Sequence, residues 1–222
     1  MSRRMRSSGV CVSLVAVVLL LALPAMADDF LQLSQGTSYQ SSTAKLNPPS
    51  VPEGSYISGL SNGVVSVNAS HNLQVLQDGS GWEGWPSPDT ESGTAMVLWN
   101  RYSNSLTLTL SADEQALGGP LTVFGFEAEP DAWDTHTIMV SFMNGTTLLG
   151  SISQDVSGSY GTKLFAASTL LPITSVIISS DIDFAIANLR YADSPAVPEP
   201  ASLILFGSGL MAVAGAIRRR LG

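Results

Sequence analysis

The sequence predicts an all-β protein whose strands form an antiparallel β-sandwich, and within that class we expect a jelly roll. Short segments alternate apolar and polar residues, as in Leu106–Leu110, where leucines alternate with threonines. Turn residues separate these segments at intervals of roughly 8 to 15 residues, which is typical of sandwiches. Only Ala112–Leu117 favours a helix, and Gly118-Gly119-Pro120 limits that helix to about two turns.

The expected strands follow a polar segment, residues 34–50, that we interpret as a loop. Asn62-Gly63 and Asn144-Gly145 are the strongest hairpin turns, because Asn and Gly tolerate the positive φ angles that such turns need. The expected strands cover residues 64–67, 73–76, 95–99, 106–110, 121–126, 137–143, 146–152, 176–178 and 182–189.

The N-terminal residues 1–27 have the parts of a secretory signal peptide. Three arginines supply a basic start, an almost wholly apolar stretch covers residues 12–23, and Pro24-Ala25-Met26-Ala27 offers a small-residue cleavage site. We therefore expect export by the general secretory route and cleavage near Ala27.

The remaining body, residues 28–195, is expected to be one secreted domain, long enough to bury about two-thirds of its unfolded surface. It contains no cysteine, because Cys11 lies in the signal peptide, so it has no disulfide. It carries four basic and 17 acidic residues, a net charge of −13. Such a surface excludes nucleic acid and anionic lipid as partners and suits neutral sugars or cations.

The C-terminal residues 196–222 have three parts in a fixed order. A Val-Pro-Glu-Pro tetrapeptide comes first, then residues 201–217 without a charge, and then three arginines. As a helix, the apolar stretch would rise about 25 Å, slightly less than the roughly 30 Å hydrocarbon core of a bilayer. We expect a transmembrane helix whose arginines stay in the cytoplasm.

This tail resembles the PEP-CTERM sorting signal of exopolysaccharide-producing Gram-negative bacteria. The resemblance implies that the helix stops transiently in the inner membrane and that an exosortase-type enzyme then processes the tail. It also implies a final location at the cell surface or in the extracellular biofilm matrix. The sorting motif is then Val197, Pro198, Glu199 and Pro200, and the topology determinants are Arg218, Arg219 and Arg220.

A second resemblance covers roughly Trp82 to Tyr191. Leu121–Glu127, Leu164–Ala166 and Phe184–Leu189 resemble segments of the passenger domains of many PEP-CTERM proteins, which are similar to lectin-like and carbohydrate-binding jelly rolls. This resemblance implies the fold and provides no binding motif.

Two patterns that suggest catalysis have simpler interpretations. Gly59–Gly63 matches the G-x-S-x-G nucleophile pattern, but the strand-like Val64–Val67 follows where that motif needs a helix. We interpret the match as chance, because Asn62-Gly63 already explains a turn at this place. The two histidines, His71 and His136, lack partners at metal-binding spacing, so we expect no zinc site.

The acidic residues near 130 allow three interpretations. Glu127 and Glu129 lie on one face of an expected strand end. Because glycosidases usually bring their two carboxylates from separated strands, we interpret the pair as solvated glutamates. Hard cations take oxygen ligands, so a structural Ca²⁺ site is the third interpretation. Its weak candidate ligands are Glu127, Glu129, Asp131 and Asp134, and we expect no other cofactor.

Trp82 and Trp85 also allow two interpretations. Their indole faces form a sugar-binding platform, or they complete the core, as large aromatic side chains most often do. We favour the core. The sequence as a whole predicts an exported, non-catalytic structural or adhesive module that binds exopolysaccharide. The alternative is a secreted hydrolase of polysaccharide or ester on a jelly-roll scaffold, and we assign no catalytic residue.

Overall fold

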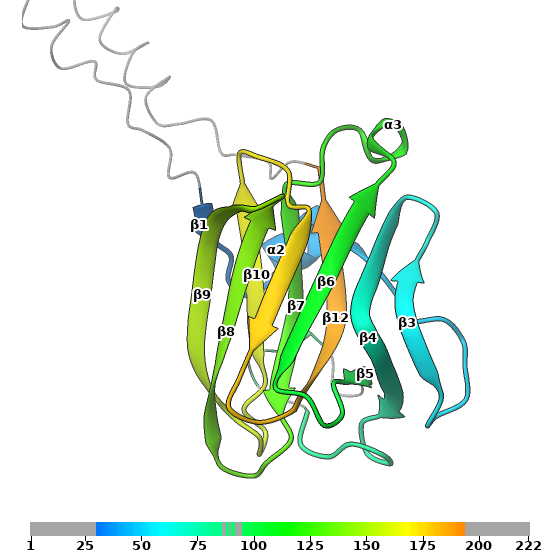
Figure 1. Ribbon diagram of the computed structural model, residues 1–222, viewed down its shortest axis with the longest axis vertical. Coiled ribbons are helices and arrows are strands. Elements are labelled where there is room, and N and C mark those ends of the chain that lie inside the picture. The colour runs from blue at the N-terminus through cyan, green and yellow to red at the C-terminus, as the bar shows by residue number, and fades with distance from the viewer. Residues whose placement is uncertain (1–29, 86–87, 89, 92–94, 194–222) are drawn as a thin grey trace, which may run out of the picture.

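The structure, a computed structural model, describes residues 30–85, 88, 90–91 and 95–193 (Figure 1). The expected signal peptide, residues 1–27, and the sorting tail, residues 196–222, lie outside the described residues. The sorting motif, the transmembrane helix at 201–217 and the arginines at 218–220 lie outside them as well. Of the helices in the described part, none has the length and apolarity that crossing a membrane requires.

The described chain consists of antiparallel strands and two short helices, which confirms the predicted all-β class. The strands are β1 (Phe30–Gln32), β2 (Ala44–Lys45), β3 (Tyr56–Ser61), β4 (Val65–Gln77), β5 (Met96–Trp99), β6 (Ser105–Ala112), β7 (Val123–Pro130), β8 (Thr135–Asn144), β9 (Thr147–Ser157), β10 (Lys163–Thr169), β11 (Ser175–Ser179) and β12 (Phe184–Ala192). The helices are α2 (Thr37–Ser42) and α3 (Glu114–Leu117).

The strands form one continuous sheet in the order β1-β10-β7-β12-β5-β4-β6-β11-β8-β9, with β2 beside β12 and β3 beside β4. This sheet folds over into two facing layers, and Figure 1 shows β6, β8 and β9 in front of β7, β10 and β12. The main core lies between the layers. It includes Leu106, Leu108, Ile138, Val140 and Phe142 from the front layer and Phe124, Phe126, Phe165, Phe184 and Ile186 from the back layer.

Local sequence explains several elements directly. In β6, the alternating leucines are buried and the threonines between them are not, as the period of a strand requires. Asp113 caps α3 by accepting hydrogen bonds from the next turn, and Gly118 ends the helix at a φ of 100°. The β8–β9 turn differs from the prediction by one residue. Asn144 still pairs with Thr147, so the turn residues are Gly145 and Thr146.

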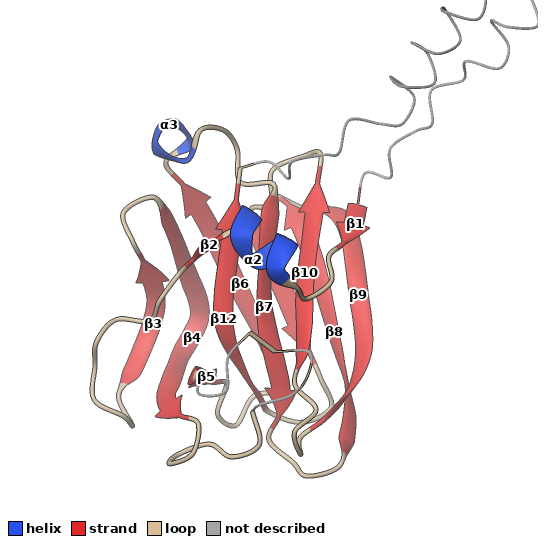
Figure 2. Ribbon diagram, turned by 180° about the vertical axis from the view of Figure 1, so that it is seen from behind, coloured by secondary structure: helices blue, strands red, loops and turns tan. Residues whose placement is uncertain are grey.

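The back layer is covered on its outer face too, which the sequence did not indicate. Residues 37–42, expected as loop, form α2, and Tyr39 of this helix packs on Leu164 and Ala166. Farther along the same face lies the segment between β4 and β5, and Figure 2 shows the back layer with α2 across it. Every residue of β7 is consequently buried, including its two glutamates.

Candidate functional site

Glu127 and Glu129 lie inside β7 with exposed fractions of 1% and 0%. The prediction that they are solvated at a strand end is wrong. The strand extends to Pro130, and the segment between β4 and β5 covers the outer face on which both side chains lie.

Both carboxylates accept hydrogen bonds from this covering segment, and Glu127 also accepts one from β12. Glu127 accepts from the indole nitrogen of Trp85 at 3.2 Å, from the backbone N–H of Glu91 at 2.6 Å and from the Asn188 amide at 2.7 Å. Glu129 accepts from the indole nitrogen of Trp82 at 2.8 Å.

Burial changes the acidity of both glutamates. It raises the pKa of Glu129 to about 8, although the Trp82 hydrogen bond acts in the opposite direction. Burial also raises the pKa of Glu127, partly offset by its hydrogen bonds from Asn188, Glu91 and Trp85. A raised pKa in a carboxyl pair is often a mark of acid–base catalysis. Here neither side chain reaches a surface where a substrate can bind, so the pair holds the covering segment in place.

Trp82 and Trp85 have exposed fractions of 7% and 0% and pack with Val97, Ala185 and Ala187 in a small second core. Both rings are therefore buried against the back layer rather than exposed as a flat platform, and their N–H groups point to buried carboxylates.

The candidate calcium ligands do not converge. Glu127 and Glu129 are buried in the back layer, whereas Asp131 and Asp134 lie exposed in the loop between β7 and β8. Asp134 instead contacts His136. Across the part of the chain that the structure describes, no group of three acidic, histidine or cysteine side chains is placed to hold a metal ion.

The histidines and Ser61 are also placed without a catalytic arrangement among the described residues. His136 lies between Asp134 and Asp181, with 2.9 Å from a ring nitrogen to each carboxylate, and these contacts raise the pKa of His136. The Ser61 hydroxyl shares a hydrogen bond with Ser66 at 2.8 Å, and β4 follows it directly, as the turn interpretation requires.

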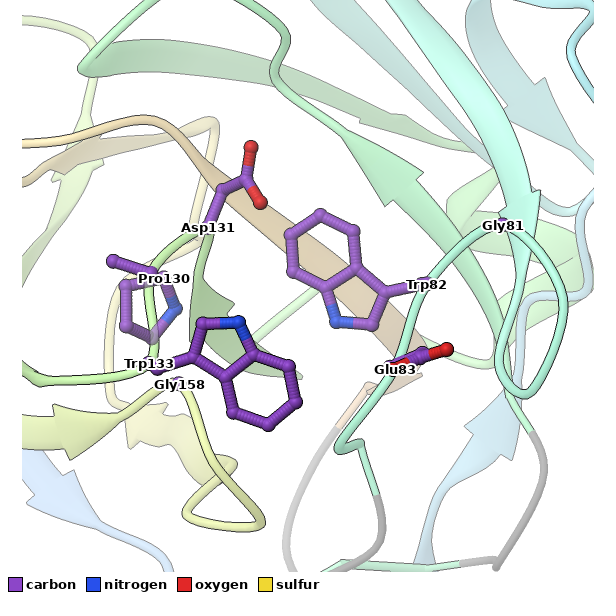
Figure 3. Close-up of a pocket in the computed structure, with 8 residues that line it drawn as sticks. Gly81, Trp82, Glu83, Pro130, Asp131, Trp133 and Gly158 are labelled. Carbon is purple, nitrogen blue, oxygen red and sulfur yellow. The ribbon is translucent and has the colours of Figure 1, made fainter.

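A surface pocket of about 190 Å³ lies at the end of the sandwich where β7 meets β8. Trp82 enters it from the segment between β4 and β5, and Asp131 and Trp133 enter it from the β7–β8 loop (Figure 3). Trp133 has an exposed fraction of 67%, unlike the buried Trp82 and Trp85. The pocket is lined by Gly81, Trp82, Glu83, Pro130, Asp131, Ala132, Trp133 and Gly158.

Close backbone contacts fix the loops around this pocket. A Cβ on Gly158 would lie 1.5 Å from the carbonyl oxygen of Ala132, so only glycine allows these two loops to pack together. The N–H of Gly158 donates to the carbonyl of Asp134 at 3.1 Å, and the N–H of Tyr160 donates to the carbonyl of Gly84 at 2.9 Å. The pocket is therefore preformed.

The pocket combines aromatic surface with the carboxyl groups of Glu83 and Asp131, which suits a ligand with both apolar faces and hydroxyls. Partial burial and the neighbouring Asp183 raise the pKa of Asp131. Trp133 was not among the candidate residues predicted from the sequence. Its position in a Pro-Asp-Ala-Trp-Asp turn between two expected strands was the available indication, because turn residues lie at the surface.

Comparisons with known proteins identify a motif in the C-terminal tail and identify no ligand. No curated protein matches the chain. Three solved structures resemble it weakly. TmCBM61 in complex with β-1,4-galactotriose is 14% identical, with a TM-score of 0.35, over 57% of this chain and 86% of that chain. The C-terminal family 22 carbohydrate-binding module of Clostridium thermocellum Xyn10B is 15% identical, with a TM-score of 0.35, over 63% of this chain and 91% of that chain.

The third structure, a xylan-binding domain of family 22, is 14% identical, with a TM-score of 0.34, over 62% of this chain and 91% of that chain. Likenesses of this degree assign neither a ligand nor a site to the present chain. The C-terminal region, in contrast, matches a family model for the PEP-CTERM protein-sorting motif over residues 196–220, which confirms the resemblance of the tail. The chain therefore carries a PEP-CTERM protein-sorting motif at residues 196–220.

Proposed function

We propose that this protein is exported, processed by an exosortase at its PEP-CTERM tail, and retained at the cell surface or in the extracellular matrix. There it acts as a non-catalytic module that binds neutral polysaccharide in the pocket lined by Trp82 and Trp133. The sorting motif at residues 196–220 supports the export route. The exposed Trp133 at the pocket supports the binding activity.

Trp133 is the observation that carries this proposal. A tryptophan with an exposed fraction of 67% places a large apolar ring in water, although such rings are favourable when buried. Trp82 provides a second aromatic wall, and the loops between them are fixed. Aromatic faces on a rigid, partly polar pocket are typical of binding sites for small organic ligands, and the flat faces of sugar rings fit such walls.

The charge of the domain favours a neutral ligand. Residues 28–195 carry a net charge of −13, and Asp131 adds a carboxyl group at the pocket itself. This surface repels acidic polysaccharides over a distance of about a Debye length, roughly 8 Å at physiological ionic strength.

The alternative of a polysaccharide hydrolase would need two carboxyl groups that flank a bound sugar. Glu127 and Glu129 are the adjacent pair that sequence suggests, and both are buried and hydrogen-bonded to tryptophans or amides. The pocket is itself lined by the carboxyl groups of Glu83 and Asp131, but the exposed ring of Trp133 is the feature on which we base the proposal of binding rather than hydrolysis.

The test compares the exported wild-type protein with Trp133→Ala and with Leu148→Ala. Leu148 is an exposed apolar residue in the β8–β9 hairpin and does not line the pocket. Retention on immobilised neutral polysaccharides, including the exopolysaccharide of the producing strain, is measured by affinity electrophoresis. We expect Trp133→Ala to lose retention by roughly tenfold or more and Leu148→Ala to behave as wild type. Equal retention of all three proteins would contradict the proposal.

A further inference from the structure

We infer that a second aromatic surface, formed by Tyr56, Trp99, Arg101 and Tyr102, extends the binding site beyond the pocket, so that the ligand is an extended chain of neutral sugars. We name this surface the tyrosine platform. The inference rests on the proposed function and adds the length of the ligand to it.

The sheet places the platform on the outer face of the molecule. Tyr56 of β3 is paired with Gln74 of β4, and Gln74 is paired with Trp99 of β5. Directly paired residues of neighbouring strands lie on the same face of a sheet. Trp99 is paired in turn with Ala185 of β12, and Trp82 and Trp85 pack over Ala185. The platform is therefore the part of this face that the covering segment leaves open.

Two tyrosines give the platform its exposed surface, and an arginine holds them. Tyr102 and Tyr56 have exposed fractions of 80% and 52%. Arg101 donates to the hydroxyl of Tyr56 at 3.0 Å and to the hydroxyl of Tyr102. Its guanidinium carbon lies 4.4 Å from the centre of the Tyr102 ring and 5.2 Å from that of Trp99. These contacts orient the rings before a ligand arrives, which reduces the entropy lost on binding.

The backbone at Tyr102 has a φ angle of 62°, in the left-handed region that a bulky residue seldom adopts. Glycine or asparagine would occupy this turn with less strain. Tyr160 has a similar φ angle of 58°, so this conformation alone does not identify a binding residue. The contacts of Tyr102 with Arg101 and Trp99 are what place its ring in the platform.

The charges around Arg101 agree with a neutral ligand. The ion pairs among the described residues involve Lys45, Arg190 and His136, so Arg101 is not neutralised by a carboxylate in that part of the chain. Its N–H groups instead bond to the two phenol oxygens, which leaves the guanidinium engaged in holding the rings. The net charge of −13 on residues 28–195 disfavours a polyanionic ligand.

The platform is continuous with the pocket through two tryptophans. The ring centres of Trp82 and Trp99 are 6.2 Å apart in an edge contact, and those of Trp99 and Tyr102 are also 6.2 Å apart. Trp82 is itself a wall of the pocket. A chain that fills the pocket and runs along these rings would contact both regions, whereas a short sugar would fill only one.

The test uses Tyr102→Asn, because asparagine tolerates the left-handed backbone and removes the ring. The matched control is Tyr160→Asn. Tyr160 has a φ of 58° and an exposed fraction of 61%, but it lies outside both the pocket lining and the platform. Titration calorimetry measures binding of neutral β-1,4-linked gluco-oligosaccharides and xylo-oligosaccharides of increasing length, from disaccharide to octasaccharide.

We expect wild-type affinity to rise with chain length and to reach roughly tenfold above that of the shortest bound sugar. Tyr102→Asn should abolish this rise and leave the affinity for short sugars unchanged, and Tyr160→Asn should keep the rise. If the affinity of Tyr102→Asn rises with chain length as that of wild type does, the inference is overturned. In that case, loss of short-sugar binding in Trp133→Ala would still support the pocket as a binding site. Binding of acidic oligosaccharides in preference to neutral ones, weakened by salt, would also overturn it. If wild type binds no sugar of any length, the proposed function fails as well.

Discussion

The indole nitrogen of Trp82 donates to the buried carboxyl group of Glu129 at 2.8 Å, while the same indole forms a wall of the surface pocket. One side chain thus connects an interior polar group to the candidate binding site. Because Glu129 determines the position of the ring, changes in the protonation of this carboxyl group are expected to affect the stability of the fold around the pocket.

The first prediction concerns pH. Burial raises the pKa of Glu129 from 4.5 to about 8, so the folded state binds this proton more tightly than the unfolded state does. The stability linked to this group is fully present below pH 4.5 and is lost as pH rises to about 8. Glu129→Gln keeps a hydrogen-bond acceptor for Trp82 but does not titrate.

We therefore expect urea unfolding of Glu129→Gln to show a flatter pH dependence than wild type between pH 4.5 and about 8. Glu127, whose pKa is also raised, contributes in the same direction in both proteins, so the difference between them isolates Glu129. Parallel pH profiles for the two proteins would contradict the prediction.

The second prediction concerns the indole donor. Trp82→Phe leaves the buried carboxyl group of Glu129 without this hydrogen bond, so we expect the free energy of unfolding to fall by about 1–3 kcal/mol beyond the loss of ring contacts. Trp99→Phe is the matched control, because the indole nitrogen of Trp99 has no hydrogen-bond partner among the described residues. An equal loss in the two variants, measured by denaturant unfolding, would show that the hydrogen bond contributes nothing.

The main sheet could be predicted from the sequence, because its strands follow local rules. The alternation in β6 and the Asn-Gly sequences at both hairpins depend only on neighbouring residues. The error of one residue at the β8–β9 turn arose because pairing of Asn144 with Thr147 decides the register. The separate strands expected at 64–67 and 73–76 are one strand, β4. Pairing with β6 continues through Ala69, and pairing with β3 resumes at Leu73 after a register shift.

The candidate site could not be predicted in the same way, because it depends on contacts between distant segments. Nothing in the local sequence shows that α2, Trp82 and Trp85 cover the outer face of the back layer, so Glu127 and Glu129 were expected in water. Trp82 and Trp133 are distant in sequence and line one pocket only because their two loops lie at the same end of the sandwich. Exposure of Trp133 and burial of Trp82 follow from this packing.

The third prediction concerns the ion pair between Glu91 and Arg190 of β12. Arg190 contacts Glu91 through two nitrogens at 2.6 and 2.8 Å and donates to the carbonyls of Gln40 and Thr43. Both charged side chains are nearly buried, with exposed fractions of 11% and 12%. Among the described residues, Arg190→Ala leaves the Glu91 carboxylate with Lys45, at 3.2 Å, as its one ion-pair partner.

We expect Arg190→Ala to lower the free energy of unfolding by about 3 kcal/mol, because removing one partner of a buried pair leaves an uncompensated charge. Lys163→Ala, which removes a positive charge elsewhere on the domain, is the control and should lower it by less than about 1 kcal/mol. The two values come from denaturant unfolding at neutral pH. A loss below about 1 kcal/mol for Arg190→Ala would mean that the pair is solvated in solution.

The fourth prediction concerns calcium. Glu127 and Glu129 accept hydrogen bonds from indole and amide donors, and the four candidate ligands do not converge. We therefore expect the thermal unfolding midpoint of the exported protein to be the same in excess Ca²⁺ and in a chelator. A ligand that binds only the folded state would raise the midpoint with its concentration, so an increase in Ca²⁺ would contradict this expectation.

The fifth prediction concerns the mature C-terminus. The sorting motif covers residues 196–220, and we propose that an exosortase processes the chain at Val197–Pro200, so intact mass spectrometry of the exported protein should show a chain that ends near Pro200. Replacing both Pro198 and Pro200 with alanine removes the restricted backbone of the tetrapeptide, and this variant should keep its tail and stay in the membrane fraction. Pro195→Ala, just outside the motif, is the control and should be processed as wild type. Cleavage near Pro200 would separate the acidic domain from the three arginines at 218–220. An extracellular protein that still carried these arginines would contradict the proposed processing. Such a result would not bear on the proposed sugar binding.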